Sequence, residues 1–222
     1  MAKRKSKTPP PRFGIGEWYG RSFVNLTKSE RKHFAAQAQN KSTAGAPHCP
    51  FLGQSCIKRG GVCSLRLYQL VNPGTGEGKA VAGDEGDLRV TCPHRFKHDA
   101  AIYSLIGELM IDTSQPLIVG EVRFLQRLTA NEEAVSEGED VGNIDNVLVH
   151  PDLDLMKWCA LEIQAVYFSG SEMGKLFRHI QTYAGNGIPF PDATRRPDYR
   201  SSGPKRLMPQ LQIKVPTLRR WG

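Results

Sequence analysis

The stretch Trp158–Phe168 has the sequence WCALEIQAVYF, and it decides the fold of the second half of the chain. Its aromatic and branched apolar residues predict a β-strand. Successive side chains of a strand point to opposite faces, so Glu162 and Gln164 share one face. Leu161 and Ala165 lie on the other face, toward a core. A carboxylate and an amide inside an apolar strand are costly to bury alone, so we expect them to meet a cation or polar partners.

The segments around this strand predict an alternation of helices and strands. Further strands are expected at 116–124, 144–149 and 211–215, and helices at 28–39, 97–111 and 173–183. Loops are expected at 13–20 (FGIGEWYG), across most of 48–95, and at 191–206. Thr27 followed by Glu30 is the pattern of a capping box at the start of the first helix. This order predicts an α/β fold, with a mixed sheet flanked by helices.

The composition along the chain divides it into three parts. Residues 1–12 are basic and proline-rich and predict a disordered tail. Residues 13–96 are expected to form a helix plus a loop-rich, four-cysteine metal-binding region inserted near the N-terminus. Residues 97–222 are expected to form the main sheet, interrupted by an acidic loop at 131–140.

The carboxylates of the second half indicate phosphodiester chemistry. Asp145 lies near the start of one expected strand, and Glu162 and Gln164 form an acid-x-polar triplet in the next. This is the layout of nucleases of the PD-(D/E)xK class. Asp145 and Glu162 would hold Mg²⁺, which takes oxygen ligands and activates a bound water. Most such enzymes have lysine as the last residue of the motif. The Gln164 amide can orient a ligand but cannot carry charge.

Glu121 is a further candidate acid. It lies within the expected strand IVGEVRF and could join the site. A salt bridge with Arg123 or Arg127 explains it equally well.

Five cysteines are present, and four of them form a group in the sequence. Cys49, Cys56, Cys63 and Cys92 are spaced C-x6-C-x6-C-x28-C within glycine-rich sequence. Four thiolates can hold a tetrahedral metal ion that stabilises the fold. The paired CxxC knuckles typical of zinc fingers are absent, and the spacing does not distinguish zinc from iron. His48, His94 and His98 are alternative ligands nearby, and Cys159 is expected in a core.

The net charge of +8 and the pI of about 9.4 favour a polyanionic partner, nucleic acid first. No apolar run approaches the roughly 20 residues that span a bilayer, and no signal peptide follows the N-terminus. A cytoplasmic protein is expected, in which disulfides are rare and a metal better explains the cysteines. The candidate DNA contacts, each of which could also be a solvated loop charge, are Lys58, Arg59, Arg195, Arg196, Arg200, Lys205 and Arg206.

Several of these segments together resemble the NotI family of type II restriction endonucleases. They are FGIGEWYG at 13–20, ERKHFAAQ at 30–37, CPFLGQSCIKRGGVC at 49–63, VTCPHRF at 90–96 and WCALEIQAVYFSG at 158–170. The resemblance implies a PD-(D/E)xK core, a homodimer, and cleavage of both strands of a GC-rich palindrome in double-stranded DNA. It implies Asp145, Glu162 and Gln164 as active-site positions, with glutamine as the family's usual residue. It also implies iron at the four cysteines.

Members of the family usually continue beyond the point where this sequence ends, so a truncated nuclease core is expected. Two other functions compete with the endonuclease. One is a catalytically inactive DNA-binding relative with a structural four-cysteine site. The other is a metal-stabilised RNA-binding protein, which leaves Glu162 and Gln164 unexplained.

Overall fold

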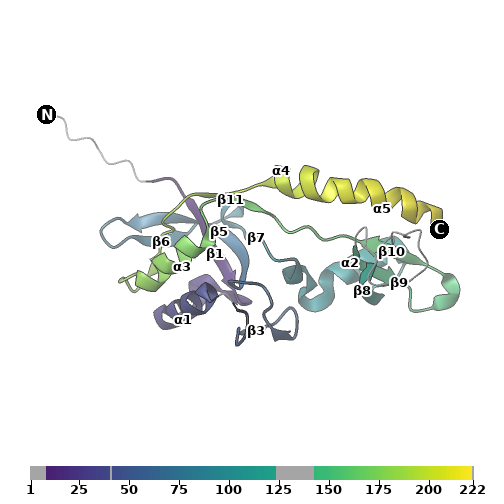
Figure 1. Cartoon of the computed structure of the whole chain (residues 1–222), viewed down its shortest axis with the longest axis horizontal. Helices are drawn as coiled ribbons and strands as arrows, with labels where there is room; N and C mark the ends of the chain where they lie inside the picture. The colour runs from purple at the N-terminus through teal and green to yellow at the C-terminus, as the bar shows by residue number, and fades with distance from the viewer. Residues whose placement is uncertain (1–8, 41, 124–142, 222) are drawn as a thin grey trace, which may run out of the picture. The chain divides into compact units, whose positions relative to one another are not determined.

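The computed structural model describes residues 9–40, 42–123 and 143–221, and Figure 1 shows their helices and strands. Most of the basic tail at 1–12 and the whole acidic loop at 131–140 therefore lie outside the described residues. The chain divides into two compact units. Unit 1 combines residues 1–95 with 165–202, and unit 2 combines residues 96–164 with 203–222. Residues 165–202, which we expected in the nuclease core, thus pack with the N-terminal part of the chain.

Unit 1 is built on a six-stranded sheet of order β12-β6-β5-β1-β2, with β7 also pairing β5. The strands are β1 (Arg12–Trp18), β2 (Arg21–Ser22), β5 (Val62–Asn72), β6 (Glu77–Ala80), β7 (Arg89–Val90) and β12 (Ile188–Pro189). Two small sheets accompany it, formed by β3 (His48–Cys49) with β4 (Gln54–Ser55) and by β11 (Phe168–Gly170) with β13 (Arg195–Pro197). The helices are η1 (Phe23–Asn25), α1 (Lys28–Gln39), η2 (Asp84–Gly86), α3 (Met173–Thr182) and α4 (Tyr199–Ser202).

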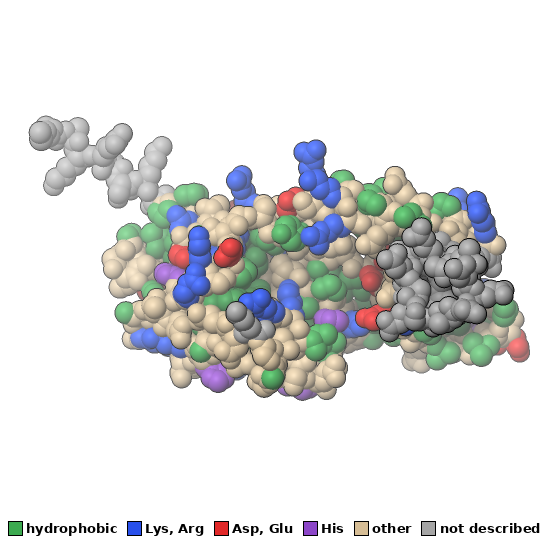
Figure 2. Space-filling model, in the orientation of Figure 1, with side chains coloured by type: hydrophobic (Ala, Val, Ile, Leu, Met, Phe, Trp, Pro, Cys, Tyr) green, Lys and Arg blue, Asp and Glu red, His purple; other side chains and the backbone are tan. Residues whose placement is uncertain are grey.

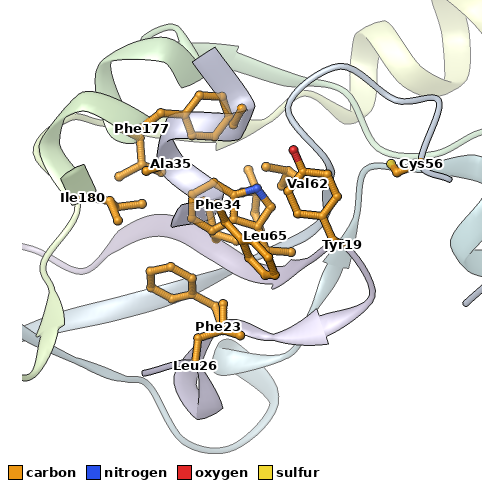
Figure 3. Close-up of a cluster of buried hydrophobic side chains, with 14 of the residues drawn as sticks. Tyr19, Phe23, Leu26, Phe34, Ala35, Cys56, Val62, Leu65, Phe177 and Ile180 are labelled. Carbon is orange, nitrogen blue, oxygen red and sulfur yellow. The ribbon is translucent and has the colours of Figure 1, made fainter. Parts of the chain in front are cut away.

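The core of unit 1 lies between α1, α3 and the sheet. Trp18 is fully buried, and its ring stacks on Phe177 of α3 at a centroid distance of 5.5 Å and meets Phe34 of α1 edge-on at 5.8 Å. Trp18 belongs to one core cluster with Phe34 and Phe177, and Figure 3 shows these two phenylalanines gathered with Phe23 and Ile180. Side chains from two separate parts of the chain, residues 1–95 and 165–202, therefore build this core.

The expected loop at 13–20 is instead mostly the strand β1. Gly14 and Gly16 serve close packing in it, because a Cβ would lie 2.7 Å from Pro191 at Gly14 and 2.6 Å from Leu88 at Gly16. The expected loop region 48–95 likewise contains β5, the central strand of the sheet. Its run LRLYQLV is rich in branched apolar and aromatic residues, a strand signal that the surrounding glycines obscured.

Unit 2 contains a three-stranded sheet of order β10-β9-β8. The strands are β8 (Leu117–Arg123), β9 (Asn143–Val149) and β10 (Trp158–Leu161). The helices are η3 (Pro93–Ala100, which starts in unit 1), α2 (Ala101–Ile111), η4 (Leu153–Leu155), η5 (Gly203–Leu207) and α5 (Met208–Trp221). Tyr103 and Ile111 of α2 pack against Leu148 of β9 to form a second core. Cys159 packs against the same core, as expected for it.

Four expectations are corrected. Every strand pair among the described residues is antiparallel, so the sheets are not mixed. The expected strand 158–168 ends as β10 at Leu161, and its last residue begins β11 in unit 1. Residues 211–215, expected to be a strand, lie inside the helix α5. The expected loop at 191–206 also contains β13 and α4.

Among the described residues, no helix has the length and apolar character needed to cross a membrane.

The expected capping box of α1 is present, and its contribution to stability can be measured. The amide of Glu30 donates to Thr27 Oγ1 over 3.2 Å, and the amide of Thr27 donates to Glu30 Oε2 over 2.8 Å. We predict that Thr27→Ala lowers the free energy of unfolding by about 1 kcal/mol, because one amide at the helix start loses its acceptor. Urea denaturation checks this value, and Thr27→Ser, which keeps the hydroxyl, should remain close to the wild type. Equal losses in both variants would contradict a role for the hydroxyl.

Candidate functional site

The carboxylates predicted from the sequence lie on one face of the sheet in unit 2. In β9 the residues Ile144, Asn146 and Leu148 are buried, and Asp145 between them is exposed. The strand therefore presents its apolar side to α2 and Asp145 to the opposite face.

The register of the three strands places the predicted acids opposite one another. Gly120 pairs with Asn146 and Val122 with Ile144, so Glu121 lies across from Asp145. On the other side Leu161 is the partner of Asn146, so Glu162 is the next residue along and also lies across from Asp145. Opposite residues of neighbouring strands are typically about 5 Å apart at Cβ. The backbone thus brings three sequence-distant acids into one row.

Glu121 stands out within this row because of its backbone. Its φ of +49° falls in the left-handed region, which residues other than glycine rarely adopt. Such conformations are costly and recur at functional sites. The side chain itself is exposed.

Asp145 makes a contact that ends the sheet. Its Oδ2 accepts a hydrogen bond of 2.8 Å from the amide of Ile163. In an antiparallel ladder that amide would face a backbone carbonyl. The carboxylate takes the place of the ladder partner, so β10 stops at Leu161 and Asp145 lies against the backbone that follows Glu162. Gln164 follows and is half-buried.

The buried face of β9 holds the row in place through a polar contact with α2. The hydroxyl of Tyr103 donates to Asn146 Oδ1 over 3.2 Å, and both residues are buried. Burial raises the pKa of Tyr103, and the nearby charge of Asp145 raises it further. The tyrosine therefore stays protonated and keeps its role as donor at neutral pH.

A lysine that the sequence analysis did not single out lies at the site. Lys214 of α5 is buried, and its Nζ lies 2.7 Å from Glu162 Oε1. A cleft of about 590 Å³ separates other residues of α5, among them Val215 and Leu218, from Trp158 and Ala160 of β10. No sequence signal identified Lys214, because residues 211–215 were assigned to a strand with no known position relative to Glu162.

The donors suit a magnesium ion. Mg²⁺ binds oxygen ligands and is usually held by one or two carboxylates together with water and substrate phosphate. Asp145 of β9 and Glu162, the residue after β10, provide two carboxylates, and Gln164 provides an amide oxygen two residues on. Within the described ranges, no group of three or more His, Cys, Asp or Glu side chains is close enough to hold an ion. The arrangement therefore fits a site that depends on water and phosphate for its remaining ligands.

The four cysteines expected to bind a metal are all buried free thiols in unit 1. Cys49 belongs to β3, Cys56 follows β4, Cys63 lies in β5 and Cys92 follows β7. The amide of Gly20 lies 3.3 Å from Cys63 Sγ and donates to it. Such amide donors favour a thiolate over a thiol.

The four thiols influence one another electrostatically. Burial raises the pKa of Cys63 to about 12, and Cys92 and Cys49 contribute to the rise. Burial also raises the pKa of Cys56, again with contributions from Cys49 and Cys92. Among the described residues, however, no three of these thiols lie close enough together to hold a metal ion. The donor chemistry suits a metal, but the thiols would have to move closer together to bind one.

The basic residues proposed to contact DNA fall into two groups. Arg59, Arg196, Arg200, Lys205 and Arg206 are exposed. Arg195 is 2% exposed and its Nη2 donates to the backbone oxygen of Glu172 over 3.1 Å. Lys58 donates to the backbone oxygens of Val62 and Thr91 over 2.8 and 2.7 Å. Figure 2 shows Lys and Arg side chains spread over the visible face rather than gathered in one patch.

Comparison with protein families gives one match. The family model described as restriction endonuclease NotI matches residues 32–222 of the 222 residues. The search of curated proteins and the search of solved structures found no match.

A comparison of Lys58 with its exposed neighbour Arg59 tests whether Lys58 has a structural role. We predict that Lys58→Met lowers the free energy of unfolding by about 1–3 kcal/mol, because two carbonyl oxygens lose a charged donor. Arg59→Met removes the same charge from the exposed neighbour and should change the free energy of unfolding by less than about 0.5 kcal/mol. Chemical denaturation of both variants provides the measurement. A stable Lys58→Met protein with weakened DNA binding would instead make Lys58 a phosphate contact.

Proposed function

The chain belongs to the NotI family of restriction endonucleases, and we propose on this basis that it hydrolyses both strands of double-stranded DNA at a GC-rich palindromic site, with Mg²⁺ as cofactor. The family match supports the class of reaction. The observation that carries the assignment to this site is the placement of Glu162 across from Asp145, with the Asp145 carboxylate bonded to the amide of Ile163. Two acids from separate strands meet there, beside a glutamine.

The helix α2 followed by the strands β8, β9 and β10 supports a nuclease core of the PD-(D/E)xK class. In this proposal Asp145 and Glu162 hold Mg²⁺, and Glu121, the third member of the row, assists from β8. Bound Mg²⁺ supplies a water of lowered pKa and neutralises charge on the phosphoryl group. The Gln164 amide orients the attacking water, since it can donate and accept hydrogen bonds but cannot take up a proton.

The basic residues supply the remaining contacts to DNA. The exposed residues Arg59, Arg196 and Arg200 suit phosphate binding or bidentate contacts with guanine. The buried Arg195 and the carbonyl-bound Lys58 suit structural roles. Of the seven candidate DNA contacts, five therefore remain: Arg59, Arg196, Arg200, Lys205 and Arg206.

We propose that the protein acts as a homodimer. A palindrome has two-fold symmetry, which a symmetric dimer matches. In the described sheet β8 has a strand partner on one side only. Its residues Leu117, Ile118 and Val119 are 49%, 45% and 49% exposed. An apolar strand edge of this kind is suited to a second copy of the chain.

The four buried cysteines are proposed to hold iron, with zinc as the alternative, as a structural site. Four thiolates suit either metal. Cys63 already accepts an amide hydrogen bond and Cys56 lies within electrostatic range of Cys49 and Cys92. The metal would link β3, β5 and the segment after β7, so its contribution is to folding.

We predict that Asp145→Asn and Glu162→Gln each lower the rate of plasmid cleavage by more than about 100-fold, because each removes an anionic ligand of the ion. Binding of DNA in Ca²⁺ should stay within about threefold of the wild type. Cleavage is read on a gel with Mg²⁺ and with EDTA. Asp154→Asn removes a comparable charge from the exposed turn η4, at the opposite end of the β9–β10 hairpin, and should cleave normally.

Discrete Mg²⁺-dependent fragments from the wild type would support a site-specific endonuclease and allow its site to be mapped. Full activity in Glu162→Gln would remove Glu162 from the site. Folded wild-type protein that binds DNA without cutting it would favour an inactive DNA-binding relative.

We predict that the purified protein contains about one iron or zinc ion per chain and that Cys56→Ser loses it. Loss of a structural ion should lower the melting temperature, since metal binding contributes to folding. Cys159→Ala, which changes the cysteine of unit 2, should keep the metal. Elemental analysis and thermal unfolding are the measurements, and unchanged metal content in Cys56→Ser would argue against the site.

A further inference from the structure

The segment 158–168, which carries Glu162 and Gln164, contains no lysine or arginine. In most PD-(D/E)xK nucleases a lysine follows the glutamate by two residues, and here that position is Gln164, which carries no charge. The structure brings a cation to the same glutamate from a distant segment. Lys214, 52 positions further along the chain, lies with its Nζ 2.7 Å from Glu162 Oε1.

Lys214 is held by three groups that fix its position. Its Nζ also donates to the backbone oxygen of Asn143 over 2.6 Å and to Gln210 Oε1 over 3.3 Å. Asn143 is the first residue of β9, two positions before Asp145, and Gln210 lies one helical turn before Lys214 in α5. The ammonium thus links the strand that carries Asp145 to the segment that carries Glu162.

The burial of this pair favours a role beyond packing. The side chains of Lys214 and Glu162 are only 8% and 9% exposed. A buried ion pair is a poor means of fastening a helix, because apolar residues of similar size are often neutral or stabilising in its place. The other basic residues of α5, Arg219 and Arg220, are exposed, so Lys214 is the basic residue of this helix that is buried.

We propose that Lys214 is the positioning residue of the cleavage site and supplies the charge that Gln164 lacks. This inference rests on the proposed endonuclease function. By holding Glu162 through Oε1, Lys214 fixes the position of the carboxylate and leaves its second oxygen available to the ion. α5 therefore belongs to the active site, although its sequence is remote from the motif.

The test compares Lys214→Met, Lys214→Arg and the matched control Arg220→Met, which removes one exposed charge from the same helix. Single-turnover cleavage, DNA binding in Ca²⁺, the Mg²⁺ concentration for half-maximal rate and the melting temperature are measured for each. Lys214→Met should lower the cleavage rate by about 10- to 100-fold and shift the Mg²⁺ requirement, as for other outer partners of a metal ligand. DNA binding should be unchanged. Lys214→Arg should recover part of the rate, since it keeps the charge but not the compact ammonium.

The outcomes separate the two proposals. If the wild type and Arg220→Met cut DNA and folded Lys214→Met cuts at the same rate with the same Mg²⁺ requirement, the role of Lys214 is overturned and the endonuclease function stands. If Lys214→Met fails to fold, the uncharged polar variant Lys214→Gln replaces it: a full rate in folded Lys214→Gln overturns the role of Lys214, and a reduced rate with normal DNA binding supports the proposal. If the folded wild type does not cut, the proposed function fails and the inference fails with it.

Discussion

The hydrogen bond from the amide of Ile163 to the carboxylate of Asp145 is the constraint on which the second unit depends. It replaces a ladder bond, so it stops β10 and releases the chain. Two residues later Ala165 is already buried in unit 1, and the amide of Val166 donates to the backbone oxygen of Val90. The Asp145 carboxylate thus ends the pairing of β10 with β9 and lies beside the segment of Glu162. The chain passes from unit 2 to unit 1 just after this contact.

Asp145 and Glu162 could be selected as candidate acids from the sequence because strand periodicity is a local property. Asp145 and Glu162 each interrupt an apolar run, and such interruptions are costly unless a function or partner offsets them. The capping box at Thr27 and the helix that follows were predictable for the same reason, since a few neighbouring residues determine them. The family resemblance is confirmed by a match over residues 32–222.

What the sequence could not supply depends on contacts between distant segments. The run WCALEIQAVYF has one continuous strand propensity, yet it is divided between two units because Asp145 competes for an amide. LQIKV is expected to form a last short strand, but it lies inside α5, which also includes Pro216. The contacts of Lys214 with Glu162 and Gln210 support the helix there. Both errors arise because tertiary contacts override local preference.

The ion pair between Glu162 and Lys214 also bears on how the protein is made. During translation the strands β8 to β10 leave the ribosome before α5, because α5 begins only at Met208. A nascent chain that has emerged only as far as Gln164 has both acids but not the lysine that holds Glu162. If Lys214 is needed for cutting, a chain released before α5 has been made carries both acids but cuts no DNA.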